Sequence, residues 1–278
     1  MCKMKLRTIA CRKVFPIGLG AMALDEYEPK PSDNDSILLL RYAAKQGINL
    51  IDTADVYGLG RNEELIGKAF PPEQKNKIII ATKAGCTRPL DYQWDTDGRP
   101  EHIREAVKES LKRLDTKQIH LYQLHAPDHR VPFKDTVKAF KELQEQGLVK
   151  FIGLCNVSIQ ELQEAQKIID VVSVQNHYNL AFKRDEDLLL PYLTKNDIAF
   201  IPYFPLGSGR LLANPKLIKI SQKYGLTPSQ LALSWIIHKW STAIPIPGTR
   251  NTLHLDENMK AAEIELQDKI VNELDSLY

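Results

Sequence analysis

The feature that most constrains the fold is a regular alternation of short apolar segments with amphipathic segments along the whole chain. A short apolar run between turn residues is typical of a strand buried on both faces, whereas apolar residues three and four positions apart indicate a helix. We therefore predict strands at residues 14–19, 48–51, 77–83, 119–124, 149–154, 171–174, 198–202 and 242–246. Helices are predicted at residues 32–46, 62–70, 100–114, 132–146, 158–168, 185–195, 215–224, 228–240, 252–262 and 267–277, the first with Ser32 as its N-cap.

These segments make about eight units in which a helix follows a strand, and units this short connect parallel strands. Eight units in roughly 250 residues predict a (β/α)8 barrel, a TIM barrel in the α/β class, with residues 1–278 as a single domain. An open doubly wound sheet is the alternative. Residues 3–14 are expected to form a β-hairpin that closes the bottom of the barrel, with its turn near Ala10 and Cys11.

Composition and charge narrow the classes of function. The net charge is +2 and no basic block stands out, so we expect no nucleic-acid partner. No apolar segment follows the charged N-terminal residues, and no run approaches the roughly 18 residues that span a bilayer, so neither a signal peptide nor a membrane partner is expected. The four cysteines are dispersed without a CxxC pair. This favours free thiols and a cytoplasmic location over disulfides or a zinc site.

Polar side chains stand at the carboxyl ends of the predicted strands, where a barrel of this kind carries its chemistry. In chain order they are Asp52, Tyr57, Lys83, His125, Asn156, Gln175 and Tyr203. A tyrosine needs a nearby cation to lower its pKa before it can act as an acid near neutral pH. Lys83, on the strand next to Asp52 and Tyr57, can supply that cation, and Asp52 can pair with it.

Seven blocks resemble, in order along nearly the whole chain, the motifs of the aldo-keto reductase superfamily. They are GLGAM (18–22), GINLIDTADVYG (47–58), ATK (81–83), LYQLH (121–125), GLVKFIGLCN (147–156), VQNHYN (174–179) and IPIPGTR (244–250). The resemblance implies a (β/α)8 fold and an NADPH-dependent oxidoreductase that reduces aldehydes or ketones to alcohols. It also implies a catalytic tetrad of Asp52, Tyr57, Lys83 and His125.

The resemblance assigns a role to each member of the tetrad. Tyr57 is the general acid that protonates the carbonyl oxygen, with a pKa lowered by Lys83. Asp52 keeps Lys83 charged and in place, and His125 donates a hydrogen bond to the carbonyl oxygen. No protein side chain can deliver a hydride, so a nicotinamide cofactor supplies it. NADPH is the expected cofactor, and NADH is less expected. No metal is expected.

A cofactor site is implied by position. Cys155, where serine is usual, lies with Asn156 and Gln175 in the segments that bind the carboxamide, although Cys155 also reads as a small buried residue. Arg250 is the best candidate for binding the 2′-phosphate of NADPH, and the alternative for it is a solvated residue at a helix start. His254 stands where arginine is frequent, which weakens the preference for NADPH. The complete predicted set is Gly20, Ala21, Met22, Cys155, Asn156, Gln175, Tyr203, Pro205, Leu206, Ser208, Gly209, Arg210, Gly248, Thr249, Arg250, His254, Glu257 and Asn258.

Three features of the sequence have competing interpretations. Trp94 either lines the substrate pocket or covers the barrel rim. Asp55, the second acid of the block 47–58, is expected to be solvated or to brace its loop. The segment from His125 to His129 resembles a metal cluster but lacks the spacing of a zinc site.

The function itself also leaves alternatives. A cofactor-sensing module of the channel β-subunit type shares this fold, and the physiological direction is either carbonyl reduction or alcohol oxidation. The substrate is a small carbonyl compound that the sequence does not identify. Residues 174–180 and 202–207 are similar to bacterial reductases that act on pyridoxal.

Overall fold

The computed structural model describes residues 5–89 and 93–278. A parallel sheet of seven strands forms its centre, with each strand hydrogen-bonded to the next in a fixed order. From one edge to the other the strands are β3 (Leu19–Gly20), β4 (Leu50–Asp52), β5 (Ile79–Ala84), β8 (Ile119–Leu124), β9 (Val149–Cys155), β10 (Val171–Gln175) and β11 (Ala199–Phe200). Because chain order and spatial order agree, the predicted succession of parallel strands is confirmed.

The eighth predicted strand, residues 242–246, closes this sheet into a barrel. On one side Ile244 N donates to the carbonyl oxygen of Phe200 in β11, at 2.8 Å. On the other side Gly18 N donates to the carbonyl oxygen of Pro245, at 2.9 Å. Since both edges of the seven-stranded sheet bond to the same segment, the (β/α)8 barrel is confirmed and the open doubly wound sheet is wrong.

This closing segment is not a regular strand, and its prolines explain why. Pro245 and Pro247 have no N–H to donate, so a continuous ladder cannot form, and Ala243 makes a single bridge to Phe200. The backbone approaches β3 closely here. A Cβ added to Gly20 would lie 2.7 Å from the carbonyl oxygen of Ile246, so only glycine fits that position.

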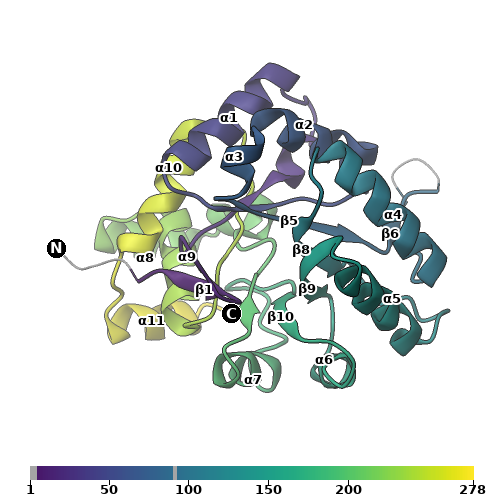
Figure 1. Ribbon diagram of the computed structural model, residues 1–278. Coiled ribbons are helices and arrows are strands. Elements are labelled where there is room, and N and C mark those ends of the chain that lie inside the picture. Colours follow the sequence, from purple (N-terminus) through teal and green to yellow (C-terminus); the bar gives the residue numbers. More distant parts are fainter. Residues whose placement is uncertain (1–4, 90–92) are drawn as a thin grey trace.

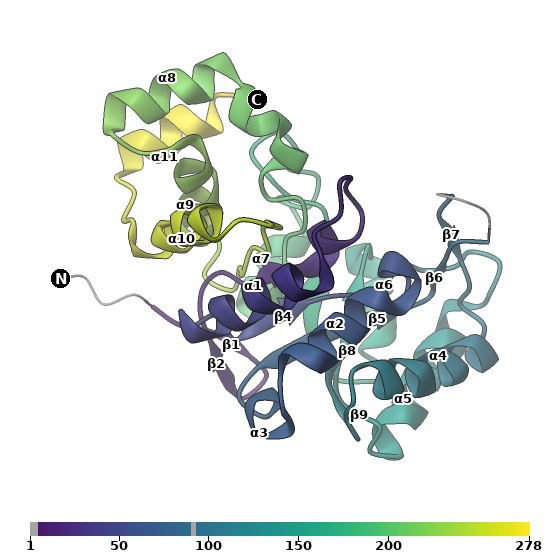
Figure 2. The same ribbon diagram turned by 90° about the horizontal axis from the view of Figure 1, so that it is seen from above.

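Helices surround the strands on the outside, as Figures 1 and 2 show. They are α1 (Asp33–Lys45), α2 (Arg61–Ala69), α3 (Pro72–Lys75), α4 (Pro100–Arg113), α5 (Phe133–Glu145), α6 (Ile159–Ala165), α7 (Leu189–Lys195), α8 (Pro215–Tyr224), α9 (Pro228–Lys239), α10 (Thr252–Lys260) and α11 (Asp268–Asp275). Ser32 caps α1 by accepting a hydrogen bond from Asp35 N, as predicted. None of the helices in the described ranges is both long and apolar enough to cross a membrane.

A hairpin closes the bottom of the barrel. Strands β1 (Arg7–Ile9) and β2 (Arg12–Val14) pair antiparallel, which confirms the prediction, while residue 3 and the rest of 1–4 lie outside the described residues. Ile9 and Val14 are fully buried in a cluster with inward-facing barrel residues such as Leu50 and Leu121. The lower half of the barrel is therefore an apolar core, and polar chemistry is left to the upper end.

Three differences from the predicted elements have a clear physical reason. The first barrel strand is shorter than 14–19, because Val14 pairs within the hairpin and Pro16 has no N–H for a ladder. The helix predicted at 185–195 begins only at Leu189, since the Asp185 carboxylate accepts a hydrogen bond from Asn176 instead. A second hairpin, β6 (Cys86–Thr87) with β7 (Asp95–Thr96), was not predicted, because its paired segments are only two residues long.

Four short 3-10 helices complete the fold: η1 (Ala21–Leu24), η2 (Tyr57–Gly60), η3 (Gly207–Ala213) and η4 (Ala261–Glu263). Of these, η1 follows β3 directly, and η2 and η3 lie in the loops after β4 and β11, where the predicted site residues also lie.

Candidate active site

A buried ion pair lies at the upper end of the barrel. Lys83 ends β5 with no exposed surface, and its Nζ lies 2.7 Å from Asp52 Oδ2 on the neighbouring strand β4. The same ammonium donates to the carbonyl oxygen of Thr53, at 2.7 Å. The second oxygen of Asp52 accepts from Gln175 Nε2 of β10, also at 2.7 Å. Each charge of the pair is thus hydrogen-bonded, which an ion pair in a barrel interior requires.

The pKa of Lys83 shows how this pairing fixes its charge. Burial is the largest influence and would by itself lower the pKa, but the charge and hydrogen bond of Asp52, together with Tyr57 and Cys155, outweigh it and the net pKa is raised. Lys83 therefore stays an ammonium at neutral pH.

Tyr57 lies in η2, beside this ammonium. Its side chain is buried, and the Nζ of Lys83 lies 5.1 Å from the centre of the phenol ring. Burial raises the pKa of Tyr57, and the charge of Lys83 opposes that rise only in part. The expectation of a lowered pKa is therefore wrong, because the loss of solvent outweighs the cation. The phenol stays protonated, which is the form a proton donor needs.

The chain after Tyr57 follows a strained path that fixes the phenol. Gly58, Leu59 and Gly60 all have positive φ values, of 55°, 53° and 97°. A Cβ added to Gly58 would lie 2.6 Å from an oxygen of Asp25, so a side chain is excluded there. Gly58 N donates to Glu26 Oε1, at 3.0 Å. Gly58 and Gly60 thus permit the tight turn that leads into α2.

His125 follows β8 directly and completes the predicted tetrad. Its backbone N donates to the carbonyl oxygen of Ala84, at 2.8 Å, which ties it to the end of β5. Its ring meets the Tyr57 ring edge to face, with centroids 5.8 Å apart. Burial and the nearby Lys83 both lower the pKa of His125 well below its usual value. The imidazole is therefore neutral, and its buried Nδ1 has no hydrogen-bond partner among the described residues.

Trp94 stands over these two rings. Its indole meets the Tyr57 ring at 6.3 Å and the His125 ring at 5.9 Å, both edge to face, while 48% of the residue remains exposed. The two interpretations of Trp94 are thus compatible, because the same side chain touches the site and covers the rim.

The residues predicted to hold the carboxamide are already bonded to the site. Asn156 lies in the left-handed region (φ 57°), accepts from the Tyr203 hydroxyl at 2.8 Å and donates to the carbonyl oxygen of His125 at 2.9 Å. Gln175 bonds to Asp52, as described above, so its amide nitrogen is used within the protein. Cys155 is fully buried, and burial raises the pKa of its thiol well above the usual value. It is a neutral, poorly donating neighbour of Lys83.

The loop predicted to cover the pyrophosphate is η3 with the residues before it. Pro205 is buried, Leu206 is half-buried, and Ser208, Gly209 and Arg210 are exposed. No carboxylate among the described residues pairs with Arg210. Ser208 and Arg210 line a cavity of about 480 Å³, together with His177, Phe204 and others, that includes none of the tetrad residues. The loop therefore presents a free guanidinium at the top of the barrel.

The segment predicted to bind the adenosine end contains a second such group. Arg250 donates to the carbonyl oxygens of Tyr27, at 3.2 Å, and of Pro29, at 2.5 Å, and forms no ion pair within the described ranges. His254 is exposed and Asn258 is buried.

Other residues of the predicted cofactor set have structural partners. Glu257 accepts hydrogen bonds from Thr227 and Ser229 at the start of α9, so its carboxylate braces that helix rather than standing free. Ala21 is buried and Met22 half-buried in η1, where Ala21 accepts from Asn62. Gly20 and Gly248 permit the close approach that shuts the barrel, and the Thr249 hydroxyl donates to Asn251 O.

The remaining surface fits a dinucleotide phosphate. Two guanidinium groups without a carboxylate partner, Arg210 and Arg250, lie along the top of the barrel, and guanidinium is well suited to phosphate. The half-buried ring of Tyr203 offers an aromatic face near Asn156.

Asp55 was given no role, and its carboxyl group is not solvated as expected. Its backbone N does brace the loop, by donating to the carbonyl oxygen of Lys83 at 3.2 Å. Its Oδ1, however, is fully buried and has no hydrogen-bond partner among the described residues. Burial, and then the buried carboxylate of Glu63, raise the pKa of Asp55 to about 8. The one signal in the sequence is that Asp55 lies between two other site residues, Asp52 and Tyr57.

Asp55→Asn is expected to stabilise the protein, and more so as the pH rises. Because the folded pKa is raised above the unfolded one, folding binds a proton between these values, and stability falls with rising pH across that window. The loss for wild type from pH 6 to pH 8 is roughly 2 kcal/mol. Urea unfolding at pH 6 and pH 8 measures this loss of stability. If the free energy of unfolding changed with pH equally in the variant and in wild type, Asp55 would not be a buried acid with a raised pKa. Asp170→Asn, at an exposed position, is the control.

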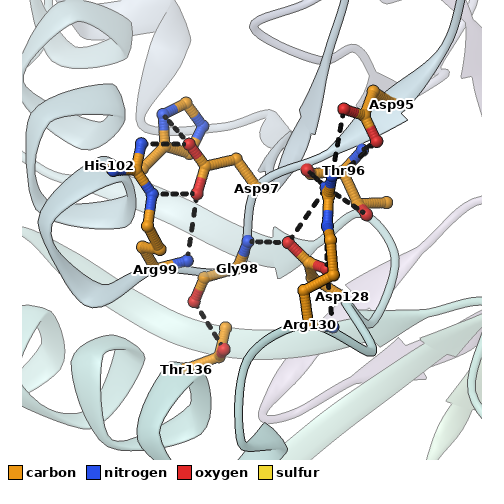
Figure 3. A network of polar contacts seen from close by, with 9 residues as sticks. All are labelled: Asp95, Thr96, Asp97, Gly98, Arg99, His102, Asp128, Arg130 and Thr136. Carbon is orange, nitrogen blue, oxygen red and sulfur yellow. Dashed lines mark hydrogen bonds and ion pairs between the residues drawn. The ribbon is translucent and has the colours of Figure 1, made fainter.

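The segment from His125 to His129 has another purpose than metal binding. The Asp128 carboxylate accepts from Gly98 N, at 3.1 Å, and from Arg130 Nε, at 2.9 Å. Figure 3 shows this acid between the two loops that it joins. Its oxygens are thus committed to hydrogen bonds within the protein.

Comparison with known proteins places the chain among described relatives. The family model for the aldo/keto reductase family matches residues 16–278. An uncharacterized oxidoreductase of Schizosaccharomyces pombe is 39% identical over 264 residues, covering 93% of this chain and 85% of that protein. Pyridoxine 4-dehydrogenase of Escherichia coli is 34% identical over 279 residues, covering 97% of both. The structure of an aldo/keto reductase from Klebsiella pneumoniae in complex with NADP and acetate is 26% identical, with a TM-score of 0.85 over 100% of this chain and 96% of that one.

Proposed function

The chain belongs to the aldo/keto reductase family, and we propose that it reduces an aldehyde or ketone to an alcohol with NADPH as the hydride donor. The observation that carries the proposal is the buried Lys83–Asp52 pair beside the protonated phenol of Tyr57. The relatives reported above are named as an oxidoreductase, a dehydrogenase and a reductase, which supports an enzyme over a channel-associated sensor.

Each member of the tetrad has a proposed role in this reaction. Tyr57 donates its proton to the carbonyl oxygen as that oxygen gains negative charge. Lys83 stabilises the phenolate that is left, and Asp52 keeps Lys83 charged and in position. His125, held neutral, donates a hydrogen bond to the same oxygen. When bound, the nicotinamide supplies the hydride that the protein lacks.

The cofactor would be held by groups along the top of the barrel. We propose that Tyr203 packs on the nicotinamide ring, while Asn156 and the amide oxygen of Gln175, whose nitrogen stays bonded to Asp52, contact the carboxamide. Arg210 would bind the pyrophosphate and Arg250 the 2′-phosphate, since both guanidiniums lack a carboxylate partner in the described part of the chain. The NADP-bound relative from Klebsiella pneumoniae supports a dinucleotide phosphate at this site.

Arg250→Gln is expected to raise the KM for NADPH roughly tenfold and to change the KM for NADH less than twofold, because a charge-assisted bond to the 2′-phosphate is lost. Steady-state kinetics with both coenzymes measures this. Arg12→Gln is the matched control, since Arg12 also donates to a backbone carbonyl, that of Asn76, but belongs to the bottom hairpin. Equal increases for both coenzymes would mean that Arg250 only holds its segment.

The direct test of the proposed function is consumption of NADPH in the presence of aldehydes. Pyridoxal is the first substrate to assay, because the relative from Escherichia coli is named for pyridoxine and aligns over 97% of both chains. Aromatic and short aliphatic aldehydes complete the panel, and the corresponding alcohols with NADP test the reverse direction. Absence of turnover in both directions would overturn the proposal.

We also propose that residues 1–278 work as one domain in the cytoplasm. Hydrogen bonds that close the barrel join Gly18 to Pro245, so the two ends of the described chain share one sheet. Cys11, Cys86 and Cys155 are free thiols, which suits a reducing compartment.

A further inference from the structure

Trp94 belongs to the β6–β7 hairpin, which is too short to be stable by itself. Strands β6 and β7 pair through only two residue pairs, Cys86 with Thr96 and Thr87 with Asp95. A two-stranded hairpin of this length is marginal in water. Trp94 precedes β7 directly and still meets the rings of Tyr57 and His125. Contacts from outside the hairpin must therefore fix the indole.

One such contact is Arg130, from the loop between β8 and α5. Its guanidinium donates to both oxygens of Asp95, at 3.0 and 3.3 Å, and also to the carbonyl oxygen of Thr96. Its Nε donates to Asp128 of its own loop, at 2.9 Å. Figure 3 shows Arg130 lying between the two acids. One planar side chain thus joins the strand that follows Trp94 to the loop that follows His125.

Burial of Asp128 restrains this contact between Arg130 and the two segments that it joins. Asp128 is nearly fully buried, and the hydrogen bond from Arg130 holds the pKa of its carboxyl group well below the usual range. Asp128 also accepts from Gly98 N, and the carbonyl oxygen of Gly98 accepts from Thr136 of α5, at 2.5 Å. The segment after β7 is therefore fastened to the body of the barrel at both Arg130 and Gly98.

A second arginine, Arg88, contacts the indole from the residue that follows β6. The guanidinium of Arg88 lies 4.3 Å from the centre of the Trp94 ring and pairs with Glu26, with both side chains largely buried. Glu26 also accepts from Gly58 N, next to Tyr57. Arg88 thus links Trp94 to the loop that carries the phenol.

We propose that Arg130 is a positioning residue that sets substrate preference by fixing Trp94 against Tyr57 and His125, so that the site favours flat aromatic aldehydes. This inference rests on the proposed carbonyl reduction. The rings of Tyr57, His125 and Trp94 contact one another edge to face, and an aromatic substrate gains from packing on them. A preset indole costs less conformational entropy on binding than a mobile one. A short aliphatic aldehyde is too small to use the indole and gains little from it.

Arg130→Gln tests this with benzaldehyde and propanal as probes. We expect the ratio of kcat/KM for benzaldehyde to that for propanal to fall about tenfold, mainly through the KM for benzaldehyde. Arg130→Lys should behave similarly, because an ammonium cannot reproduce the fork that spans two acids. Asp95→Asn should weaken the same contact between Arg130 and β7, because it removes the charge of the carboxylate that Arg130 pairs with. Arg104→Gln is the matched control, since Arg104 makes a comparable pair with Glu142 between α4 and α5.

A second readout does not depend on turnover. The chain has three tryptophans, and the difference between each protein and its Trp94→Phe counterpart isolates the fluorescence of Trp94. Arg130→Gln should make this fluorescence more accessible to acrylamide, whereas Arg104→Gln should not. Unchanged quenching in Arg130→Gln, or an unchanged substrate ratio, would overturn the inference. If wild type turned over no compound of the panel in either direction, the proposed function would fail, while quenching would still decide whether Arg130 holds Trp94 in place.

Discussion

Tyr57→Phe is expected to lower kcat for aldehyde reduction roughly 10³-fold while the affinity for NADPH stays within about threefold. The phenol is a buried hydroxyl beside Lys83 that stays protonated at neutral pH. Phenylalanine keeps the ring contacts with Ala54, Val56 and Met22 but has no proton to give. Single-turnover kinetics and fluorescence titration with NADPH separate the chemical step from cofactor binding.

Tyr122→Phe is the matched control for this variant. Tyr122 is also a fully buried tyrosine, on β8, and its hydroxyl has no hydrogen-bond partner among the described residues. Its removal should leave kcat unchanged and the protein no less stable. If Tyr57→Phe retained more than about a tenth of wild-type turnover, Tyr57 would not be the proton donor.

Lys83→Met is expected to abolish reduction and to destabilise the protein by about 3–5 kcal/mol, because it leaves the buried carboxylate of Asp52 without its cation. Gln175 still donates to Asp52, but an amide cannot neutralise the charge. The double variant Asp52→Asn/Lys83→Met should recover most of the stability, since no buried charge remains, and should stay inactive. Urea unfolding and aldehyde turnover, measured on the two single variants and the double variant, complete the cycle.

Lys75→Met provides the comparison for a buried lysine with a solvated partner. Lys75 is also nearly fully buried, but its partner Asp115 has 80% of its side chain exposed. Since water can solvate Asp115 after the change, we expect a smaller loss, of about 1 kcal/mol, and normal turnover. A loss for Lys83→Met as small as that for Lys75→Met would show that Asp52 is not held as a buried charge.

The barrel and the placement of the tetrad were predictable because both depend on local patterns. An apolar run that ends in a carboxylate identifies β4 and Asp52, and the same pattern identifies β5 and Lys83. Parallel strands in a barrel bring their carboxyl ends to one face, so Asp52, Lys83 and His125 had to meet. The eighth strand was predicted at residues 242–246, but its irregular form, which its prolines cause, was not. The strands β6 and β7 of the second hairpin were missed because two residues are too few to show a period.

The partners of individual side chains were not predictable in the same way. Gln175 was expected to face a cofactor amide, yet it bonds to Asp52, which lies 123 residues earlier in the chain. Glu257 was expected at the adenosine end, yet it braces the start of α9. Such pairings depend on the distance between segments that are remote in sequence, and no local pattern records that distance.

The sequence by itself determined the alternation of strands and helices, the barrel that follows from it, and which strand ends carry an acid, a phenol, a lysine and a histidine. These follow from local residue type and spacing. Only the tertiary structure decided that burial raises the pKa of Tyr57 despite Lys83, that the Asp55 carboxyl group is buried, and that Arg130 bonds to Asp95 beside Trp94. Solvent exclusion and contact between distant loops arise when the whole chain packs, so they exist only in the folded molecule.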